Sequence, residues 1–222
     1  MIDVWERAGM HFACVIDDDY PSQLLAIHQR PAFVMWMGTQ SPRDAEGVAV
    51  VGSREACAAG VATAREVAAE LADNQITVIS GLAKGVDTAA HLGSLEAGGR
   101  TVAVIGTGLR RSYPAANAEL QRRIAREGMV LSQFLPDAPP AKYSFPMRNA
   151  VMSGLAAVTL VVEATEGSGA RMQARLALEH GRPVLLMSSL LKQNWAGELA
   201  RRPGSRLGGR RRQLPQGGGP GR

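Results

Sequence analysis

The sequence has no long hydrophobic segment, because no apolar run approaches the roughly 20 residues that a membrane-spanning helix needs. Residues 1–7 contain two acidic side chains and no apolar stretch of the kind found in secretory signals, so we expect a cytoplasmic protein. Only two cysteines are present, Cys14 and Cys57, and they lie far apart. We therefore expect free thiols in a reducing compartment, without a disulfide framework.

Common motifs of cofactor and metal enzymes are also missing. Gly52 stands where a dinucleotide-binding motif would begin, but the next glycine is Gly60, and neither GxxxxGK[ST] nor HExxH occurs. The four histidines show no metal-ligand spacing. His91 falls within a helical pattern, where we expect it to pack or to form a hydrogen bond. The sequence therefore predicts no cofactor and no metal site.

Acids and serines beside glycine-rich segments are the remaining candidates for catalysis. Glu163 and Glu166 lie close enough in sequence for acid–base chemistry, but ion pairs with Arg54 and Arg171 are a simpler interpretation. No evident base accompanies the three serines of these segments, Ser53, Ser80 and Ser168. Ligand binding without turnover explains these residues better, so we predict that the protein is not an enzyme.

Acidic residues are absent from the end of the chain. Of the 25 lysines and arginines, seven are arginines within residues 201–222, where no acidic residue occurs. The other 200 residues hold 18 basic and 20 acidic side chains, so this end alone makes the net charge +5 and the pI about 9.8. The overall charge is therefore no argument for nucleic-acid binding by the folded part.

Short, β-branched apolar runs alternate with helical patterns from Gly47 onward. This alternation predicts an α/β fold: a doubly wound, mostly parallel sheet with helices on both faces. We expect strands at 31–38, 48–52, 76–80, 101–105, 129–132, 158–163 and 183–187. We expect helices at 23–29, 58–73, 87–97, 115–126, 146–155, 169–180 and 188–199.

The expected elements divide the chain into three parts. Residues 1–46 are predicted to form an N-terminal leader that packs on the core, and residues 47–200 a Rossmann-like domain. Residues 201–222 are rich in Arg, Gly and Pro and cannot build a core, so we expect a disordered tail.

One turn, within residues 78–91, has the composition of an anion site. Gly81 and Gly85 allow a tight strand-to-helix turn, and Asp87 is a suitable N-cap for the helix that follows. The free N–H groups of a helix N-terminus attract anions, and Lys84 adds a positive charge there. An ordinary βα turn has a similar composition, so the segment alone favours an anion site only slightly.

Cations follow every predicted strand of the domain at the edge where doubly wound sheets bind ligands. The folded chain should bring together Arg54, Lys84, Arg110, Arg111, Lys142, Arg148 and Arg171. Other arginines are expected on helix faces beside acidic residues: Arg65, Arg122, Arg123 and Arg126. A cluster of positive charge on a core of net charge −2 predicts a polyanionic or phosphate-rich ligand.

Longer motifs, which contain four of these cations, follow one another in a fixed order within residues 13–187. They are Val50–Arg54, Ser80–Asp87, 103–108, 113–114, Phe145–Asn149, 153–155, 161–164 and 168–171. Together they resemble the DNA-processing protein A (DprA/Smf) family. The resemblance implies an extended Rossmann-like fold and a bacterial protein that binds and protects incoming single-stranded DNA, loads the RecA recombinase during natural transformation, and has no established catalytic activity.

The resemblance also implies which residues bind DNA. Arginines and lysines would contact phosphates, Phe145 would stack on a base unless it is a core aromatic, and Asn149 would hydrogen-bond a base or sugar edge. The implied site comprises Gly52, Ser53, Arg54, Ser80, Gly81, Lys84, Gly85, Gly106, Gly108, Arg110, Lys142, Phe145, Arg148, Asn149, Gly167, Ser168, Gly169 and Arg171.

The chain departs from the family pattern after Met187. The usual end of the Rossmann domain is replaced by residues 188–199 and by the tail, so the C-terminal end reads as divergent or truncated. Family members form homodimers through this end, which makes dimerisation the implied property that the departure affects most.

Two other functions are compatible with such a fold. One is a nucleotide-processing enzyme of the phosphoribohydrolase type, although the chain lacks the PGGxGTxxE-type loop of those enzymes. The other is an interaction module that senses a small signalling nucleotide. Both would bind a mononucleotide in place of a DNA strand.

Overall fold

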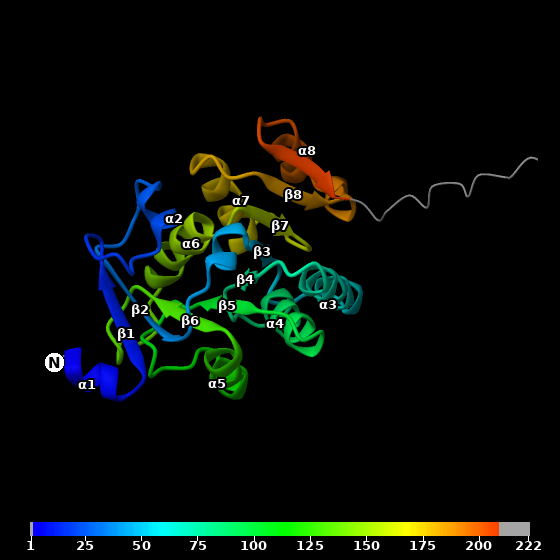
Figure 1. The fold of residues 1–222 in the computed structure, drawn as a ribbon. Coiled ribbons are helices and arrows are strands. Elements are labelled where there is room, and N and C mark those ends of the chain that lie inside the picture. Colours follow the sequence, from blue (N-terminus) through cyan, green and yellow to red (C-terminus); the bar gives the residue numbers. More distant parts are fainter. Residues whose placement is uncertain (1, 209–222) are drawn as a thin grey trace, which may run out of the picture.

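A computed structural model describes residues 2–208, which form one nine-stranded sheet with helices on both faces (Figure 1). The strand order is β1-β2-β6-β5-β4-β3-β7-β8-β9, and the seven strands from β6 to β9 in this order pair in parallel. This confirms the predicted α/β fold with a doubly wound, mostly parallel sheet.

Most strands lie where the sequence places them. They are β1 (Met10–Cys14), β2 (Phe33–Gly38), β3 (Val48–Val51), β4 (Val78–Ser80), β5 (Thr101–Val104), β6 (Met129–Ser132), β7 (Val158–Val161), β8 (Val184–Met187) and β9 (Ser205–Gly208). The helices are α1 (Ile2–Arg7), α2 (Ser22–Leu25), α3 (Ala58–Asp73), α4 (Val86–Glu96), α5 (Ala118–Glu127), α6 (Ser144–Leu155), α7 (Gly169–Glu179) and α8 (Asn194–Ala200). Between 48 and 187, the predicted ends are shifted by only a few residues.

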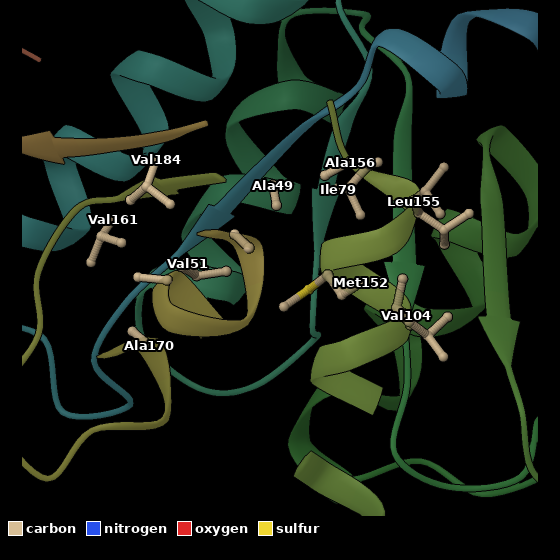
Figure 2. Packing of buried hydrophobic residues seen from close by; sticks show 14 of the residues in the cluster. Ala49, Val51, Ile79, Val104, Met152, Leu155, Ala156, Val161, Ala170 and Val184 are labelled. Atoms are coloured by element: carbon tan, nitrogen blue, oxygen red, sulfur yellow. The ribbon is translucent and has the colours of Figure 1, made fainter. Parts of the chain in front are cut away.

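Apolar core clusters cover the central strands on both faces of the sheet. In β5, Val104 packs in the core beneath α6 with Met152 and Leu155 (Figure 2). Ala103, the preceding residue, lies in another of these clusters with Ile124 of α5. Successive side chains of a strand point to opposite faces, so burial on both faces requires apolar residues at every position. This is the pattern that identified the strands in the sequence.

The chain reverses its direction of growth across the sheet at β3. From β3 it adds β4, β5 and β6 on one side, and β7 then returns to pair with β3 on the other side. The loops that follow β3 and β7 therefore leave the same edge of the sheet in opposite directions. In doubly wound folds this is the position where a ligand site forms.

The expected leader contributes strands to the same sheet. β2 confirms the predicted strand 31–38 and pairs antiparallel with β6, and β1, which we did not predict, pairs antiparallel with β2. The helix expected at 23–29 is shorter, since α2 ends at Leu25. Asp44, between β2 and β3, accepts hydrogen bonds from Arg100 Nε at 2.7 Å and Thr77 Oγ1 at 3.1 Å. These bonds connect the leader to the parallel part of the sheet.

The C-terminal end of the described chain is ordered secondary structure. Residues 188–199, predicted to be helical, form a short 3-10 turn (Ser188–Lys192) and then α8. The expectation of a disordered tail from residue 201 is wrong for its first part, because β9 pairs in parallel with β8. Backbone hydrogen bonds form this strand without apolar burial, which a composition argument does not detect. Residues 209–222 of the expected tail lie outside the described residues.

None of the helices within residues 2–208 is both long and apolar enough to span a bilayer. Both cysteines of this part are free thiols, as predicted. The histidines, cysteines and acids between residues 2 and 208 form no group of three or more that would hold a metal ion.

Candidate functional site

A pocket of about 460 Å³ lies beyond the carboxyl ends of β3 and β7, where the order of strands reverses. We call it the switch-point pocket. Its wall is formed by the loops that follow the two strands and by the facing sides of α6 and α7. The predicted site residues that line it are Gly52, Ser53, Arg54, Phe145, Arg148, Asn149, Gly167, Ser168 and Gly169.

The loop after β3 is held in place from below. The backbone N–H of Ser53 donates to the carbonyl of Glu163 at 2.7 Å, and a Cβ at Gly52 would lie only 2.4 Å from Val86 Cγ2. Gly85, with φ at +77°, turns the chain beneath this loop, and a Cβ on it would clash with the backbone carbonyls of Ser53 and Arg54. Arg54 therefore leaves a fixed backbone and extends into solvent at the mouth of the pocket.

Phe145 lies between an arginine and a tyrosine. The guanidinium carbon of Arg54 is 5.3 Å from the centre of its ring, and the ring of Tyr113 lies 5.4 Å away at an angle of 45°. Gly106 lies under the ring, since a Cβ there would be 2.9 Å from Phe145 Cδ1. Phe145 is only half-buried. Phe145 is therefore not an interior core residue. It is the middle layer of a partly exposed stack, between Arg54 and Tyr113.

Arg148 is at the back of the pocket and is almost completely buried, with 5% of its surface exposed. Its Nη1 donates to the carbonyl of Val104 at 3.0 Å, and Nε has no hydrogen-bond partner among the described residues. Gly81 makes room for it, because a Cβ at that position would lie 1.5 Å from Nη1. Close approach, and not the tight turn we predicted, is therefore what requires glycine at residue 81.

Asp87 faces the charge of Arg148 across the buried end of β4. Burial raises the pKa of Asp87 above its usual value, and the positive charge of Arg148 opposes that rise. The prediction that Asp87 is the N-cap of α4 is wrong: the N-cap is Gly85, and Asp87 lies in the first turn, where its carboxylate accepts from the N–H of Ala83 at 3.4 Å. The buried charge of Arg148 is stabilised by a nearby carboxylate, and Asp87 provides it from the first turn of α4 and therefore does not cap the helix.

His91 packs and forms a hydrogen bond, as predicted. It is fully buried, and its Nδ1 lies 2.7 Å from Thr101 Oγ1. The Thr101 hydroxyl donates to the carbonyl of Val78, so it accepts from the histidine. Burial, with the nearby charge of Arg148, lowers the pKa of His91 to about 3. The imidazole is therefore neutral at physiological pH.

The loop before α7 forms the open side of the pocket. Ser168 occupies the N-cap position of α7 without a side-chain capping bond, and nothing lies within 4 Å of a Cβ placed on Gly167 or Gly169. The helix has eleven residues and its axis begins at the pocket wall. Its first N–H groups and the positive end of its dipole favour an anion there.

Several predicted site residues lie elsewhere. Lys84, Arg110 and Lys142 are exposed and do not line the pocket, and Arg110 pairs with Asp137 at 3.2 Å. Ser80 is buried and donates to the carbonyl of Val50, and Gly108 packs against the backbone of Pro136. The loop cations therefore do not all meet at one point. They are distributed along the edge of the sheet, with Arg54 and Arg148 at the pocket itself.

The two acids considered for catalysis have different surroundings. Glu166 pairs with Arg171 at 3.3 Å, as we expected. For Glu163 the expected arginine pair is wrong: its carboxylate accepts from the N–H and the thiol of Cys57, at 3.1 and 2.9 Å. Cys57 is the N-cap of α3, so Glu163 places a negative charge at the positive end of that helix. This is a structural role.

The arginines assigned to helix faces do pair with acids. Arg65 pairs with Glu96, and Arg123 with Glu127 at 3.0 Å. Both Arg122 and Arg126 pair with Glu119, on α5. These side chains lie outside the lining of the switch-point pocket, which confirms that they form a group distinct from Arg54 and Arg148.

A second pocket, of about 400 Å³, lies between α7 and α8. We call it the Trp195 pocket. Arg171, which we expected among the cations of a single site, lines it, and its guanidinium carbon lies 6.0 Å from the centre of the Trp195 ring. Sequence reasoning did not place Trp195 at a site, and the residue does pack in the apolar core, with 4% of its surface exposed. Sequence reasoning also missed Tyr113, whose position beside the loop cations was the available signal.

Comparison with known proteins identifies relatives over most of the chain. A family model described as DNA recombination-mediator protein A matches residues 11–201. DNA processing protein DprA of Streptococcus pneumoniae is 42% identical over 170 residues, which cover 77% of this chain and 60% of that protein. The chain therefore spans less than two thirds of this relative. The match through residue 201 includes residues 188–199, which the sequence interpretation had placed outside the family pattern.

Solved structures agree with this comparison. The X-ray structure of DprA from S. pneumoniae superposes with a TM-score of 0.81 at 35% identity, over 93% of this chain and 75% of that one. A structure describing the single-stranded DNA binding mode of DNA processing protein A from Helicobacter pylori has a TM-score of 0.78 at 26% identity, covering 89% and 90% of the two chains. The description of the family names a recombination mediator and no catalytic activity. The chain belongs to the DNA recombination-mediator protein A (DprA/Smf) family.

Proposed function

We propose that this protein binds single-stranded DNA in the switch-point pocket. The observation that supports the proposal most is the layered arrangement of Arg54 on Phe145 at the mouth of a pocket whose opposite wall is the N-terminus of α7. A planar guanidinium both stacks on bases and binds phosphate oxygens, and the helix N-terminus attracts a second phosphate. The pocket thus offers contacts to both chemical parts of a nucleotide.

A single strand fits this site better than a duplex. Stacking requires an exposed base face, which a base pair inside a helix does not present. The glycine residues 167 and 169 leave the backbone of the α7 loop accessible, so a sugar–phosphate chain can approach it closely. The cations outside the pocket, Lys84, Arg110 and Lys142, would then contact phosphates of the same strand along the edge of the sheet.

We further propose that the bound strand is protected and passed to a RecA recombinase in the cytoplasm, during DNA uptake and recombination. The support is the family description, which names a recombination mediator. A homodimer formed through the C-terminal end of the domain is part of the same proposal. The described end contains α8 and β9, both surface elements next to the sheet edge.

The proposal is tested by measuring affinity for single- and double-stranded oligonucleotides of one sequence at increasing salt, with a chain of residues 1–208. Removing residues 209–222 eliminates four arginines that would bind DNA without any pocket. We expect a clear preference for the single strand and a steep loss of affinity with salt. Equal affinity for the two forms, or no binding without the last residues, would contradict the proposal.

Phe145→Ala sharpens this test. Loss of the stack should weaken single-strand binding by about 1–3 kcal/mol and leave the salt dependence nearly unchanged, because no charge is removed. Tyr143→Ala is the matched control, since Tyr143 lies on the same segment, is 68% exposed and does not line the pocket. Thermal melts of both variants show whether folding is preserved. An equal loss of affinity in both variants would mean that the pocket is not the site.

A further inference from the structure

The switch-point pocket and the Trp195 pocket are adjacent. Gly167, Ser168 and Met172 line both of them, so the loop before α7 and the first turn of this helix form a shared wall. Ser168 Oγ, in this wall, is inaccessible to solvent and has no hydrogen-bond partner among the described residues. The two pockets are therefore separated by this loop alone, and a ligand chain that occupied both would have to cross it.

Each pocket contains an arginine that lies over an aromatic ring. Arg54 covers Phe145 at 5.3 Å in the first, and Arg171 covers Trp195 at 6.0 Å in the second. A guanidinium that stacks on an aromatic ring with one face offers the other face to a second flat group. In single-stranded nucleic acids that group is a base.

The stack in the Trp195 pocket is held in position before any ligand binds. Trp195 is 4% exposed, and its Nε1 donates to Gln193 Oε1 at 2.7 Å. Arg171 donates to the carbonyl and the carboxylate of Glu166, at 3.2 and 3.3 Å. Trp195 is thus fixed, and the bonds to Glu166 orient the partly exposed Arg171, which lowers the cost of ordering this side chain when a base stacks on it.

The charges of the Trp195 pocket suit a phosphodiester. Its wall contains three arginines and two glutamates, Glu166 and Glu198, and Arg175 pairs with a third glutamate, Glu179, at 3.3 Å. The charges therefore balance, and Arg202 is exposed beside the pocket. A singly charged backbone phosphate can approach Arg202, whereas a free nucleoside triphosphate would bring several negative charges to a wall that has no positive excess.

We propose that the Trp195 pocket is a second nucleotide subsite, which binds a base and phosphate further along the strand that occupies the switch-point pocket. The inference rests on the proposed function and extends it: single-stranded DNA crosses the loop 167–169 and makes two successive stacks on arginine. Affinity must then rise with oligonucleotide length until both subsites are filled. Trp195 must also report the filling of the second.

The experiment uses oligothymidylates of graded length, from a trinucleotide upward, with the full chain. Affinity is measured for the parent, for Arg171→Gln and for Arg122→Gln, a matched control on α5 that lines neither pocket. Tryptophan emission is followed in the parent and in Trp195→Phe, and the difference between these two isolates the signal of Trp195.

In the parent we expect an emission change at Trp195 and a gain in affinity, both above a threshold length. Arg171→Gln should reduce the ratio of long-strand to short-strand affinity by about fivefold to more than a hundredfold, the equivalent of one lost stack. Arg122→Gln should keep the parental ratio.

Three results would overturn the inference: affinity that does not depend on length, emission of Trp195 that never changes, or an equal loss for short and long strands in Arg171→Gln. In all three the proposed function stands as long as short strands bind. Failure of every oligonucleotide to bind would overturn both.

Discussion

The switch-point pocket has an arginine at its mouth and another at its back, and their surroundings differ in almost every respect. Arg54 is exposed and stacks on Phe145. Arg148 is 5% exposed, donates to a backbone carbonyl and faces the buried carboxylate of Asp87. Both are cations beside a proposed phosphate path, so composition alone assigns them the same role. Burial separates them.

The difference lies in what happens to each charge when the ligand is absent. Water solvates the guanidinium of the exposed Arg54, and in the proposed complex a phosphate replaces that water. Arg148 has already lost its water on folding, and the protein compensates it with the Val104 carbonyl and with Asp87. An arginine of the second kind contributes a fixed positive potential to the pocket. The fold depends on it much more than on the first.

Replacing Arg148 should therefore have the largest effect, and the quantity that changes should be the free energy of unfolding. Arg148→Met removes the positive charge that faces the buried carboxyl group of Asp87 and leaves that group without compensation; breaking such a buried arrangement typically costs about 3–5 kcal/mol. The measurement is urea unfolding at pH 7, with Arg54→Met as the matched exposed arginine, for which we expect a change below about 0.5 kcal/mol. Equal stability of the two variants would show that the fold depends no more on Arg148, at the back of the pocket, than on Arg54, at its mouth.

The sequence predicts the sheet far better than it predicts this distinction. Apolar runs such as residues 101–105 can be recognised as strands in the sequence, because both faces of the sheet are buried and nearly every position is apolar. The motif Phe145–Asn149 identified the pocket, but could not show that Arg148 enters the protein while Arg54 leaves it. That depends on the missing side chain at Gly81, a contact between segments 67 residues apart in the chain.

Elements without such a signal were missed for related reasons. β1 and β9 are edge strands that backbone pairing holds in place, so neither has a continuous apolar pattern. Asp87 is a residue type that is common at N-caps, and only the buried Arg148 explains why its carboxylate faces the interior of the protein. Trp195 acquires its partner Arg171 from a different helix. In each case the decisive neighbour is remote in sequence.

A second prediction concerns the pH dependence of stability and the buried His91, whose pKa the charge of Arg148 also lowers. His91 has a folded pKa of about 3, against an ordinary value of 6.5, so the unfolded chain takes up a proton that the folded chain does not. Its contribution to stability is complete above pH 6.5 and is lost as the pH falls toward 3. The expected loss at pH 5 is about 2 kcal/mol.

Measurement of this effect requires a difference, since other groups titrate nearby. The raised pKa of Asp87 acts in the opposite direction, because the fold favours its protonated form as the pH falls. The comparison is therefore between the unfolding free energies of the parent and His91→Gln from pH 7 to pH 5. The parent should lose stability more steeply by about 2 kcal/mol over this range. Parallel profiles would show that folding does not lower the pKa of His91.

The smallest effect is expected at the mouth, for Arg54→Lys. The charge is retained, but lysine cannot bind a phosphate through two N–H groups in a plane, and it covers the ring of Phe145 less well. Loss of about one hydrogen bond predicts an affinity for single-stranded DNA weaker by about 1 kcal/mol, or roughly fivefold, with stability unchanged.

Salt dependence separates the two contributions of Arg54. Arg54→Lys keeps the charge and should keep the parental slope of log affinity against log salt, whereas Arg54→Gln should lower that slope by about 0.7. A Lys variant that binds like the parent would show that Arg54 acts only as a charge, in the way we assign to Arg148. A Gln variant with the parental slope would show that no phosphate is bound at the mouth, and the contrast between the two arginines would then rest on stability alone.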